Sequence, residues 1–400
     1  MQVVILDKHP IADGRIERHI KYLLSQNYQV IRIHFNRSEP ALSPGPFSQF
    51  GEKGYRINVT PKSTPIKTNP LYFNLFCSSR LIISRAKEAM RSMEIDTTLP
   101  TIVHVHDPAL LYCAGILKRS YFANSKIVYD RHEVYERRTS IKGVKIPKIA
   151  RFYETRMNKY IDGVISVSKL HNASIQELFP KAMVDTVPNY PSIADYNHEK
   201  IINKVKNAGG NGTIQLTYVG SLANNYDRDI DLLLTIYEEA MRLHQNVICS
   251  IGGDCNDREI ENKFVDFKSD FGDRFEYLGR IPRSQTVDLT ERSHLGFFLI
   301  RPDTTYWVRW SPNKVYEYLI CGVVPVIRAN IDHAEKIAAC SLIFNRDTPC
   351  DEIIQEVVNL LGDPTRLQTM MENALALSND FTFESVGINY TNMYNRLLRK

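Results

Sequence analysis

The sequence predicts an α/β protein built on two mostly parallel sheets with helices on both faces. Three observations support this prediction. Short apolar runs alternate with amphipathic segments, the alternation restarts after a glycine-rich stretch at 209–212, and 400 residues exceed what one hydrophobic core usually holds. The two series are of nearly equal size, so we expect two domains with a cleft between them. Ligands of such sheets bind where the strands end.

The first half opens with a strand, a helix and a second strand. Val3–Leu6 is apolar, the segment Arg15–Gln26 repeats apolar residues at helical spacing, and Gln29–Ile33 is a second apolar run. Between Pro40 and Pro70 we expect loop with one short strand. The further strands expected in this half are Tyr55–Val59, Thr101–Val105, Lys126–Tyr129 and Gly163–Val167.

A domain boundary is expected near 195–212, because proline-rich chain at 187–191 and the glycine run at 209–212 interrupt regular structure. We therefore expect one domain over 1–205 and another over 206–380. The chain ends in an amphipathic helix after Glu384. The elements expected in the second half are strands at Ile214–Val219, Val247–Ile251, Phe275–Tyr277, Leu295–Ile300 and Val324–Ile327 and helices at Asp229–Leu243 and Lys314–Cys321.

Charge is unevenly distributed along the chain. Residues 1–200 hold 29 Lys and Arg against 18 Asp and Glu, although the net charge of the whole chain is only +5. A basic half is compatible with nucleic acid, a membrane surface or an anionic substrate, and charge alone leaves all three open. No apolar run is long enough to span a membrane, and the start has no basic leader, so a cytoplasmic protein is expected.

The stretch from Ser311 to Ile327 is the most informative. Ser311, Pro312, Asn313 and Lys314 lead into a helix that Gly322 ends, and an apolar strand follows. The N-terminus of a helix offers unpaired N–H groups and a positive dipole end, which suit a diphosphate. Glu317, one turn into this helix, could accept hydrogen bonds from a ribose diol. A capped helix with an incidental surface Glu is the alternative.

This stretch resembles the donor motif of glycosyltransferase family 4-like retaining enzymes with the GT-B fold, in the branch with Tyr-Asp-x-His-Glu and Pro-Asn-Lys-x-x-Glu-Tyr motifs. The resemblance implies two facing Rossmann-like domains, with residues 381–400 returning to the first. It also implies that Glu317 binds the ribose and that the loop 311–314 lies against the pyrophosphate and the sugar. The sequence departs from the family at Arg309, where a Glu is usual, and at Ser221, where an Arg is usual.

Further donor-site residues follow from the same resemblance. Two strand ends with glycine turns, after Ile251 and Tyr277, are expected to approach the nucleotide base, although each alone is a common strand ending. Arg228 is expected to stand for the usual lysine of a basic pair. Arg301, Arg309 and Lys314 are candidates for the second cation. The remaining residues assigned to the donor site are Gly220, Gly253, Arg280 and Ile281.

Two strand ends of the first half carry clustered polar residues. His104, His106 and Asp107 end one strand, with the two histidines on the same face, and Asp130, His132 and Glu133 end the next. A metal site at His104, His106 and His132 is one interpretation, although the spacing matches no known zinc motif. The resemblance instead implies that His132 is the active-site histidine facing the transferred sugar. Asp130 and Glu133 would then lie near the acceptor, with His106 nearby.

The first turn, with Asp13, Gly14 and Arg15, resembles the family's loop that approaches the acceptor or the phosphates. A plain helix start capped by Asp13 is the alternative. Residues 131–159 hold nine Lys and Arg against three Glu. Such a stretch suits an anionic membrane face or a solvated helix, and the resemblance favours the peripheral membrane contact.

We therefore expect transfer of a sugar from a UDP- or GDP-type donor to a glycan or lipid-linked glycan, with retention, in cell-surface polysaccharide synthesis. In this interpretation the nucleotide sugar is a substrate, and no metal or other cofactor is expected because the protein's own cations neutralise the diphosphate. The alternatives are a sugar-nucleotide epimerase of the same fold and a non-catalytic glycosyltransferase-like subunit. Nucleic-acid binding ranks last, because no nucleic-acid motif accompanies the basic stretch.

Overall fold

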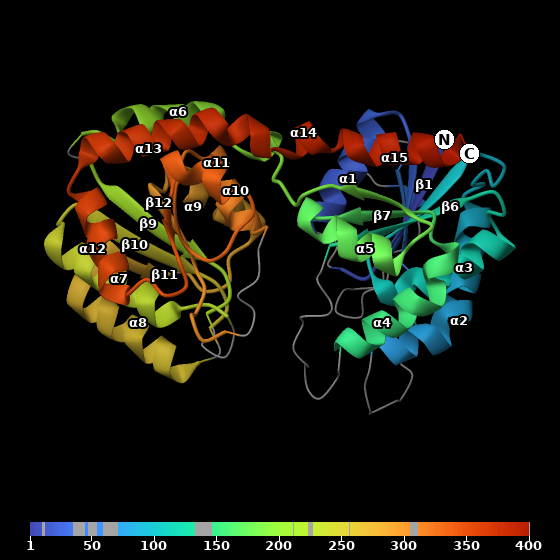
Figure 1. Ribbon diagram of the computed structural model, residues 1–400, viewed down its shortest axis with the longest axis horizontal. Helices are drawn as coiled ribbons and strands as arrows, with labels where there is room; N and C mark the ends of the chain where they lie inside the picture. Colours follow the sequence, from blue (N-terminus) through green and yellow to red (C-terminus); the bar gives the residue numbers. More distant parts are fainter. Residues whose placement is uncertain are drawn as a thin grey trace. The chain divides into compact units, whose positions relative to one another are not determined.

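The computed structural model describes residues 1–9, 13–34, 45–46, 54–58, 71–132, 146–210, 212–222, 227–255, 257–304 and 311–399. The chain divides into two compact units. The first unit comprises Met1–Pro188 and Val386–Lys400, and the second comprises Asn189–Ser385 (Figure 1). The C-terminal segment therefore returns to the first unit.

The division between the units falls earlier than the boundary expected near residue 205. Helix α6 (His198–Asn207) belongs to the second unit, because its apolar residues Ile201 and Val205 are buried in that unit's core. Lys204 adds hydrogen bonds from its Nζ to two backbone carbonyls of the same unit. The glycine run at 209–212 therefore follows the first helix of the second unit instead of marking the boundary.

The first sheet has eight strands among the described residues, in the order β3-β4-β2-β1-β5-β6-β7-β8. Its strand pairs are parallel except for the antiparallel pair β3–β4 at one edge. The strands are β1 (Gln2–Asp7), β2 (Gln29–His34), β3 (Gly45–Pro46), β4 (Gly54–Asn58), β5 (Thr101–Val105), β6 (Lys126–Arg131), β7 (Gly163–Ser166) and β8 (Met183–Thr186).

Helices pack on both faces of this sheet (Figure 1). The core between them is formed by strand residues such as Val4, Val103 and Ile127, which are fully buried. Each such side chain contributes roughly 1.5–3 kcal/mol by leaving water. The α-helices are α1 (Gly14–Ser25), α2 (Leu71–Ser92), α3 (Leu111–Ser120), α4 (Ile146–Met157), α5 (Asn172–Leu178) and α15 (Ile388–Leu398).

The second sheet has six parallel strands among the described residues, in the order β11-β10-β9-β12-β13-β14. They are β9 (Ile214–Val219), β10 (Val247–Gly252), β11 (Phe275–Tyr277), β12 (Leu295–Leu299), β13 (Val324–Arg328) and β14 (Leu342–Phe344). The remaining helices are α6, α7 (Ile230–Leu243), α8 (Arg258–Phe271), α9 (Arg283–Arg292), α10 (Asn313–Ile320), α11 (Ala334–Ile337), α12 (Cys350–Leu361), α13 (Pro364–Leu377) and α14 (Phe383–Val386).

These two units confirm the predicted fold class, with strands where the apolar runs occur. Short 3-10 helices connect some elements, namely η1 (Pro108–Leu110), η3 (Asn158–Tyr160), η4 (Lys169–His171), η5 (Ile193–Asp195), η6 (Gly272–Arg274), η7 (Ala338–Cys340) and η8 (Ser378–Phe381). Within the described part of the chain, no helix is both long and apolar enough to cross a membrane.

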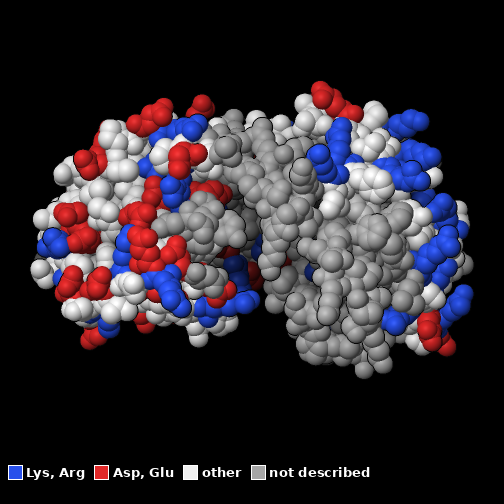
Figure 2. Space-filling view, turned by 90° about the horizontal axis from the view of Figure 1, so that it is seen from below, with Lys and Arg blue, Asp and Glu red and all other residues white. Residues whose placement is uncertain are grey.

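The surfaces of the two units differ in charge. In the face drawn in Figure 2, Lys and Arg side chains gather on the described surface of the first unit, whereas acidic and basic side chains intermingle on the second. This distribution agrees with the excess of Lys and Arg in residues 1–200.

Candidate functional site

Polar side chains converge where neighbouring strands of the first sheet end. The residues His106 and Asp107 follow β5, and Asp130 and His132 lie at the end of β6. Helix α1 starts at the same edge, because it follows β1, the neighbour of β5. Since parallel strands all end at one edge of a sheet, residues distant in sequence meet there. This convergence was expected for His104, His106, Asp130 and His132.

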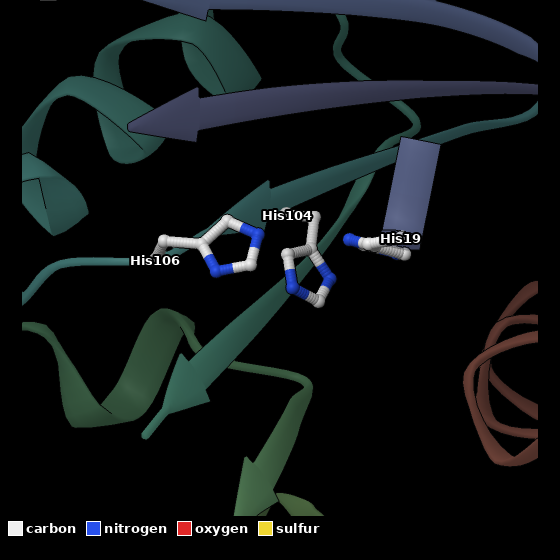
Figure 3. Close-up of side chains that lie close together, drawn as sticks. All are labelled: His19, His104 and His106. Atoms are coloured by element: carbon white, nitrogen blue, oxygen red, sulfur yellow. The ribbon is translucent and has the colours of Figure 1, made fainter. Parts of the chain in front are cut away.

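Three of the converging side chains are buried imidazoles. His104 and His106 come from the end of β5 and His19 from α1, and their rings turn toward one another (Figure 3). All three are fully buried. Burial lowers the pKa of each imidazole, well below the usual value for His19 and His106, so these rings are neutral at physiological pH.

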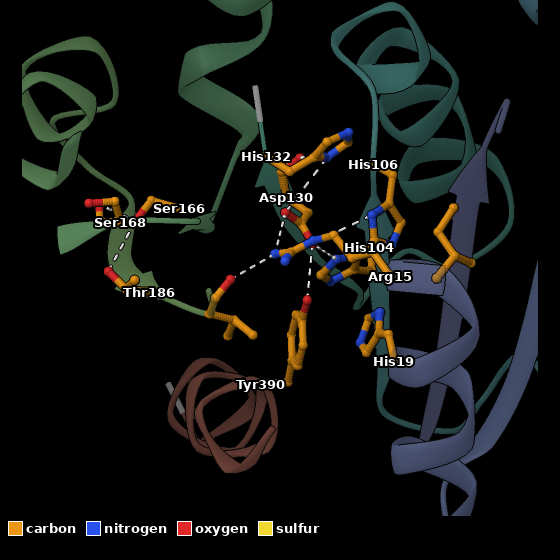
Figure 4. A network of polar contacts seen from close by, with 12 residues as sticks. Arg15, His19, His104, His106, Asp130, His132, Ser166, Ser168, Thr186 and Tyr390 are labelled. Carbon is orange, nitrogen blue, oxygen red and sulfur yellow. Dashed lines mark hydrogen bonds and ion pairs between the residues drawn. The ribbon is translucent and has the colours of Figure 1, made fainter. Parts of the chain in front are cut away.

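Asp130 is the charged centre of this cluster (Figure 4). Arg15 Nε donates to Asp130 Oδ2 at 3.0 Å and Arg15 Nη2 donates to Oδ1 at 2.9 Å, a bidentate pair with both residues buried. Burial alone would raise the pKa of Asp130, but the Arg15 charge and the surrounding imidazoles hold it well below its usual range. Asp130 is therefore a permanently ionised anchor, poorly suited to accept a proton.

Several further groups face the Asp130 carboxylate. Tyr390 Oη donates to Oδ2 at 3.1 Å. The ring nitrogens His106 Nδ1 and His104 Nε2 lie 3.5 and 3.6 Å from the same oxygen. Arg15 Nη2 also donates to the carbonyl of Val187, just beyond β8, at 3.1 Å. The carboxylate thus links β5, β6, α1 and α15.

His132 is the imidazole at the rim of this cluster, with 14% of its side chain exposed. Its Nδ1 lies 3.3 Å from the backbone carbonyl of Asp130 and 3.9 Å from Oδ1. Nδ1 therefore carries the hydrogen, and Nε2 holds the lone pair. Burial lowers the pKa of His132, so the ring is neutral and can accept a proton or a hydrogen bond.

A second ionic cluster lies beside His132. Asp107 Oδ1 is 3.1 Å from Lys8 Nζ, and Asp107 Oδ2 is 3.1 Å from His9 Nε2. Burial opposes both charges, yet the pairing dominates. It lowers the pKa of Asp107 to about 2 and raises that of His9 to about 9. The His9 ring, 5.2 Å from that of His132, is therefore an imidazolium at neutral pH.

The expected loop residues Asp13, Gly14 and Arg15 lie at the start of α1, where Asp13 and Arg15 make different contacts. The Asp13 side chain accepts hydrogen bonds from the backbone N–H groups of Arg15 and Ile16, as expected for a helix cap. Arg15 turns inward to Asp130 and is buried. Two expected positions, Glu133 and Arg309, lie outside the described residues.

Glycine turns line the ends of strands in the second sheet. Gly220 N donates to Gly252 O at 2.8 Å, and Gly253 N donates to Gly279 O at 2.7 Å, so the turns after β9, β10 and β11 stack on one another. Gly253 has a φ of +148°, and a Cβ there would overlap the carbonyl oxygen of Gly220. Only glycine fits this turn.

Two of the expected cations lie near these turns. Lys314 Nζ is 4.7 Å above the centre of the Tyr218 ring and fills the space that a Cβ on Gly220 would take. Burial, aided by the charge of Arg228, lowers the pKa of Lys314 to about 7. Arg228 lies 4.7 Å over the Phe298 ring and pairs with Asp227 at 2.9 Å. Arg301, also a candidate, is instead paired with exposed Asp303.

The other expected donor residues lie on or near α10 and β11. Pro312 is the residue before α10, and Ser311 Oγ lies 3.2 Å from Tyr316 Oη. The Glu317 carboxylate forms an ion pair with Arg283, whose Nη2 lies 3.4 Å from Tyr196 Oη. Of the rest, Asn313 is exposed, Ile281 packs against Gly252, and Arg280 is exposed and lies 3.9 Å from Asp254.

Sequence reasoning missed several residues of the first cluster. His19 follows Arg15 by one helical turn, and Tyr390 and Tyr394 occupy the buried face of an amphipathic helix. A polar residue on the inward face of a helix indicates a buried polar contact, but the sequence does not show which residue it contacts. The other residues missed are Lys8, His9, Arg283 and Tyr196.

Among the residues that the structure describes, two groups of side chains have the types that bind metal ions, namely His19, His104 and His106, and His106, Asp130 and His132. The ligand atoms of each group lie within 4.8 Å of one another. Their donors are partly engaged, since Arg15 binds both oxygens of Asp130 and Tyr394 binds His19 and His104. A cation bound to Asp130 would also lie beside the guanidinium of Arg15, which disfavours a metal there.

Comparison with known proteins gives structural likeness only. No family model matches the sequence, and no curated protein matches it. The fold is similar to that of sucrose-phosphate synthase from Thermosynechococcus elongatus, with a TM-score of 0.69 and 14% identity over 100% of this chain and 99% of that one.

Two further solved structures cover the chain equally well. Anabaena Alr3699/HepE, solved in complex with UDP and glucose, has a TM-score of 0.66 and 12% identity over 99% of this chain and 100% of that one. WaaG, a glycosyltransferase involved in lipopolysaccharide biosynthesis, has a TM-score of 0.64 and 13% identity over 98% and 99%. The chain therefore has the GT-B fold.

Proposed function

We propose that this chain is a retaining, family 4-like glycosyltransferase that moves a sugar from a UDP- or GDP-type donor to a glycan or lipid-linked glycan. The observation that carries the proposal is the group formed by stacked glycine turns, Lys314 and Arg228 at strand ends of the second sheet. Glycine turns allow a nucleotide to approach the backbone, and two cations suit its diphosphate. Among the structural neighbours, Alr3699/HepE was solved with UDP-glucose.

In this proposal the second unit binds the donor. Lys314, Arg228 and the N–H groups at the start of α10 would stabilise the negative charge that develops on the leaving diphosphate. Glu317 would bind the ribose, which requires it to leave or share its ion pair with Arg283. Because the protein supplies these cations, we propose that no metal takes part.

The first unit would supply the groups at the transferred sugar. His132, with its Nε2 lone pair at the rim of the cluster, is proposed to face the sugar and the acceptor hydroxyl. Asp130 would hold this ring and not act as a base, because its charge is fixed by Arg15. In a retaining transfer without a covalent intermediate, an oxygen of the leaving phosphate can take the acceptor proton.

The acceptor is proposed to be part of a cell-surface polysaccharide or its lipid-linked precursor, reached at the cytoplasmic face of a membrane. Helix α4 supports this proposal, because Phe152 is 53% exposed there beside Arg151 and Arg156. Basic residues around an exposed aromatic suit an anionic bilayer surface.

The first test is release of nucleoside diphosphate from UDP- and GDP-sugars by the full chain, with product analysis by NMR. We predict that His132→Ala lowers turnover by about 100-fold or more, because the side chain proposed to orient the sugar and the acceptor hydroxyl is lost, with the donor KM within about twofold. His198→Ala, in the second unit, is the control. Equal turnover of His132→Ala and the parent would contradict the assignment, and a product epimerised without acceptor would favour the epimerase.

A further inference from the structure

The C-terminal helix α15 places two tyrosines against the buried cluster of the first unit. Tyr390 and Tyr394 lie one helical turn apart on the same face and are fully buried. Asn389 Nδ2 fixes the helix to β8 by donating to the carbonyl of Thr186 at 2.9 Å. The two tyrosines therefore reach the cluster from a helix more than 250 residues away in sequence from Asp130.

Tyr390 contacts both the Asp130 carboxylate and the His19 imidazole. Its hydroxyl donates to Asp130 Oδ2 at 3.1 Å, on the oxygen that His104 and His106 also face. Its ring stacks on that of His19, with 4.0 Å between the centroids. The Tyr390 hydroxyl therefore holds the Asp130 carboxylate from the side of α15, as Figure 4 shows.

Tyr394 bridges two imidazoles. Its Oη lies 2.7 Å from His104 Nδ1 and 2.9 Å from His19 Nε2. A tyrosine hydroxyl has one hydrogen, so it donates to one of these nitrogens and accepts from the other. The two histidines must therefore present unlike nitrogens to it, one with a lone pair and one with a hydrogen.

The neighbouring carboxylate determines which imidazole presents a hydrogen to Tyr394 and which presents a lone pair. His104 Nε2 faces Asp130 Oδ2 at 3.6 Å and carries the hydrogen there, since an ionised carboxylate only accepts. His104 Nδ1 then holds the lone pair and accepts from Tyr394, which in turn accepts from Nε2–H of His19. The hydrogen bonds run in one direction, from His19 through Tyr394 to His104, and the Nε2–H of His104 points toward the Asp130 carboxylate at 3.6 Å.

We propose that Tyr394 and Tyr390 are positioning residues for catalysis. They fix the tautomer of His104 and the orientation of the Asp130 carboxylate, whose Oδ1 lies 3.9 Å from Nδ1 of His132. This inference rests on the proposed function for its catalytic consequence, but not for the tautomer. In this proposal helix α15 contributes residues to the site.

A purely structural role would not need these hydroxyls. A buried phenol costs free energy unless its hydroxyl is paired, so a position that only fills space is better served by phenylalanine. Here both tyrosine hydroxyls form hydrogen bonds within one polar network around Asp130. Replacing Tyr394 by Phe would leave His104 Nδ1 and His19 Nε2 facing a hydrocarbon ring.

The experiment compares Tyr394→Phe and Tyr390→Phe with the control Tyr22→Phe in the full-length chain. Tyr22 Oη lies 3.3 Å from Thr391 Oγ1, so this control also removes a hydroxyl between α1 and α15. The first readout is the ¹⁵N chemical shifts of the histidine rings, which report tautomers without any substrate. The second is kcat and donor KM for release of nucleoside diphosphate.

We expect Tyr394→Phe to change the ring ¹⁵N shifts of His104 and His19 and to lower kcat about tenfold, with donor KM within about twofold. Tyr390→Phe should lower kcat similarly, and Tyr22→Phe should change neither readout. Unchanged ring shifts in Tyr394→Phe would overturn the inference, as would an equal loss of kcat in Tyr22→Phe. If the parent released no diphosphate, the proposed function would fail, while the ring shifts would still decide the tautomer.

Discussion

At the scale of single residues, Lys314 links electrostatics to donor binding. Its pKa of about 7 means that its amine is mostly neutral at pH 8 in the unliganded chain. A bound diphosphate favours the charged amine and raises this pKa, so binding takes up a proton at pH 8. Affinity for UDP or GDP should then fall as pH rises from 7 to 9, by up to about tenfold per pH unit.

This prediction is checked by titration calorimetry in buffers of different ionisation enthalpy. The proton uptake seen with the parent should vanish in Lys314→Met, and the remaining affinity should no longer depend on pH over this range. Affinity that stays constant from pH 7 to 9 in the parent, with no buffer dependence, would show that Lys314 does not contact the diphosphate.

His9 and Asp107 provide a pH dependence of folding stability. The folded pKa of His9, about 9, lies above its ordinary value of 6.5, so its pairing stabilises the fold fully below pH 6.5. This stabilisation is lost as pH rises through 9, and it amounts to at most about 3 kcal/mol. Denaturant unfolding of the parent and of His9→Asn at pH 6.5 and 9.5 measures it. An identical pH dependence in both proteins would refute the ion pair.

Residue types at strand ends allowed part of the first cluster to be predicted. Asp130, His106 and His132 lie together because parallel strands end at one edge, a property that sequence periodicity shows. Their partners could not be predicted in this way. The contact between Tyr394 and His104 joins residues 290 apart, and no local pattern encodes such a pairing.

At the scale of secondary-structure elements, the turn after β10 depends on glycine. Gly253 and Gly272 both have positive φ, but a Cβ on Gly272 meets open space whereas one on Gly253 meets the Gly220 carbonyl. Gly272→Ala should therefore cost about 1–2 kcal/mol of backbone strain. Gly253→Ala should cost more than about 3 kcal/mol, because the backbone must also move.

Thermal unfolding of the two glycine variants makes this comparison. The Gly253→Ala variant should also lose nucleotide affinity, since its turn lies beside Gly220 and Lys314, while Gly272→Ala should keep it. Equal melting temperatures and equal affinities in the two variants would mean that the turn is not constrained as described.

Most of the buried apolar strands were predictable from the sequence. β1 and β5 contain buried apolar runs and β9 alternates apolar with polar residues, so the pattern alone reveals them. β8 reads Met-Val-Asp-Thr, lies at a sheet edge and is only partly buried, so nothing in its pattern distinguishes it from loop. The boundary between the units was misplaced because α6 is an ordinary amphipathic helix. Its sequence shows which face is apolar but not which core that face packs against.

At the scale of the whole molecule, the charge difference between the units predicts where a membrane would bind. Phe152 in the first unit and Val265 in the second are exposed apolar side chains, with exposed fractions of 53% and 68%. Binding to vesicles with anionic lipids should weaken as salt rises, because the attraction is electrostatic and screened. Phe152→Asp should weaken it further, whereas Val265→Asp should not.

Vesicle co-sedimentation at low and high ionic strength measures this binding. Neutral vesicles are the control for the lipid, and Val265→Asp is the control for loss of an exposed apolar side chain. Equal binding to neutral and anionic vesicles would contradict a role for the basic surface.

The central claim is that the chain binds a nucleotide sugar through its own cations. Calorimetric titration of the full chain with UDP, GDP, ADP and their common sugar conjugates, with and without a chelator, tests it most directly. We predict selective binding of one nucleotide that is insensitive to chelator and weakened in Glu317→Ala. If none of these nucleotides binds, the claim is contradicted and a non-catalytic subunit is favoured. If a chelator abolishes binding, the proposal that the site needs no metal is contradicted.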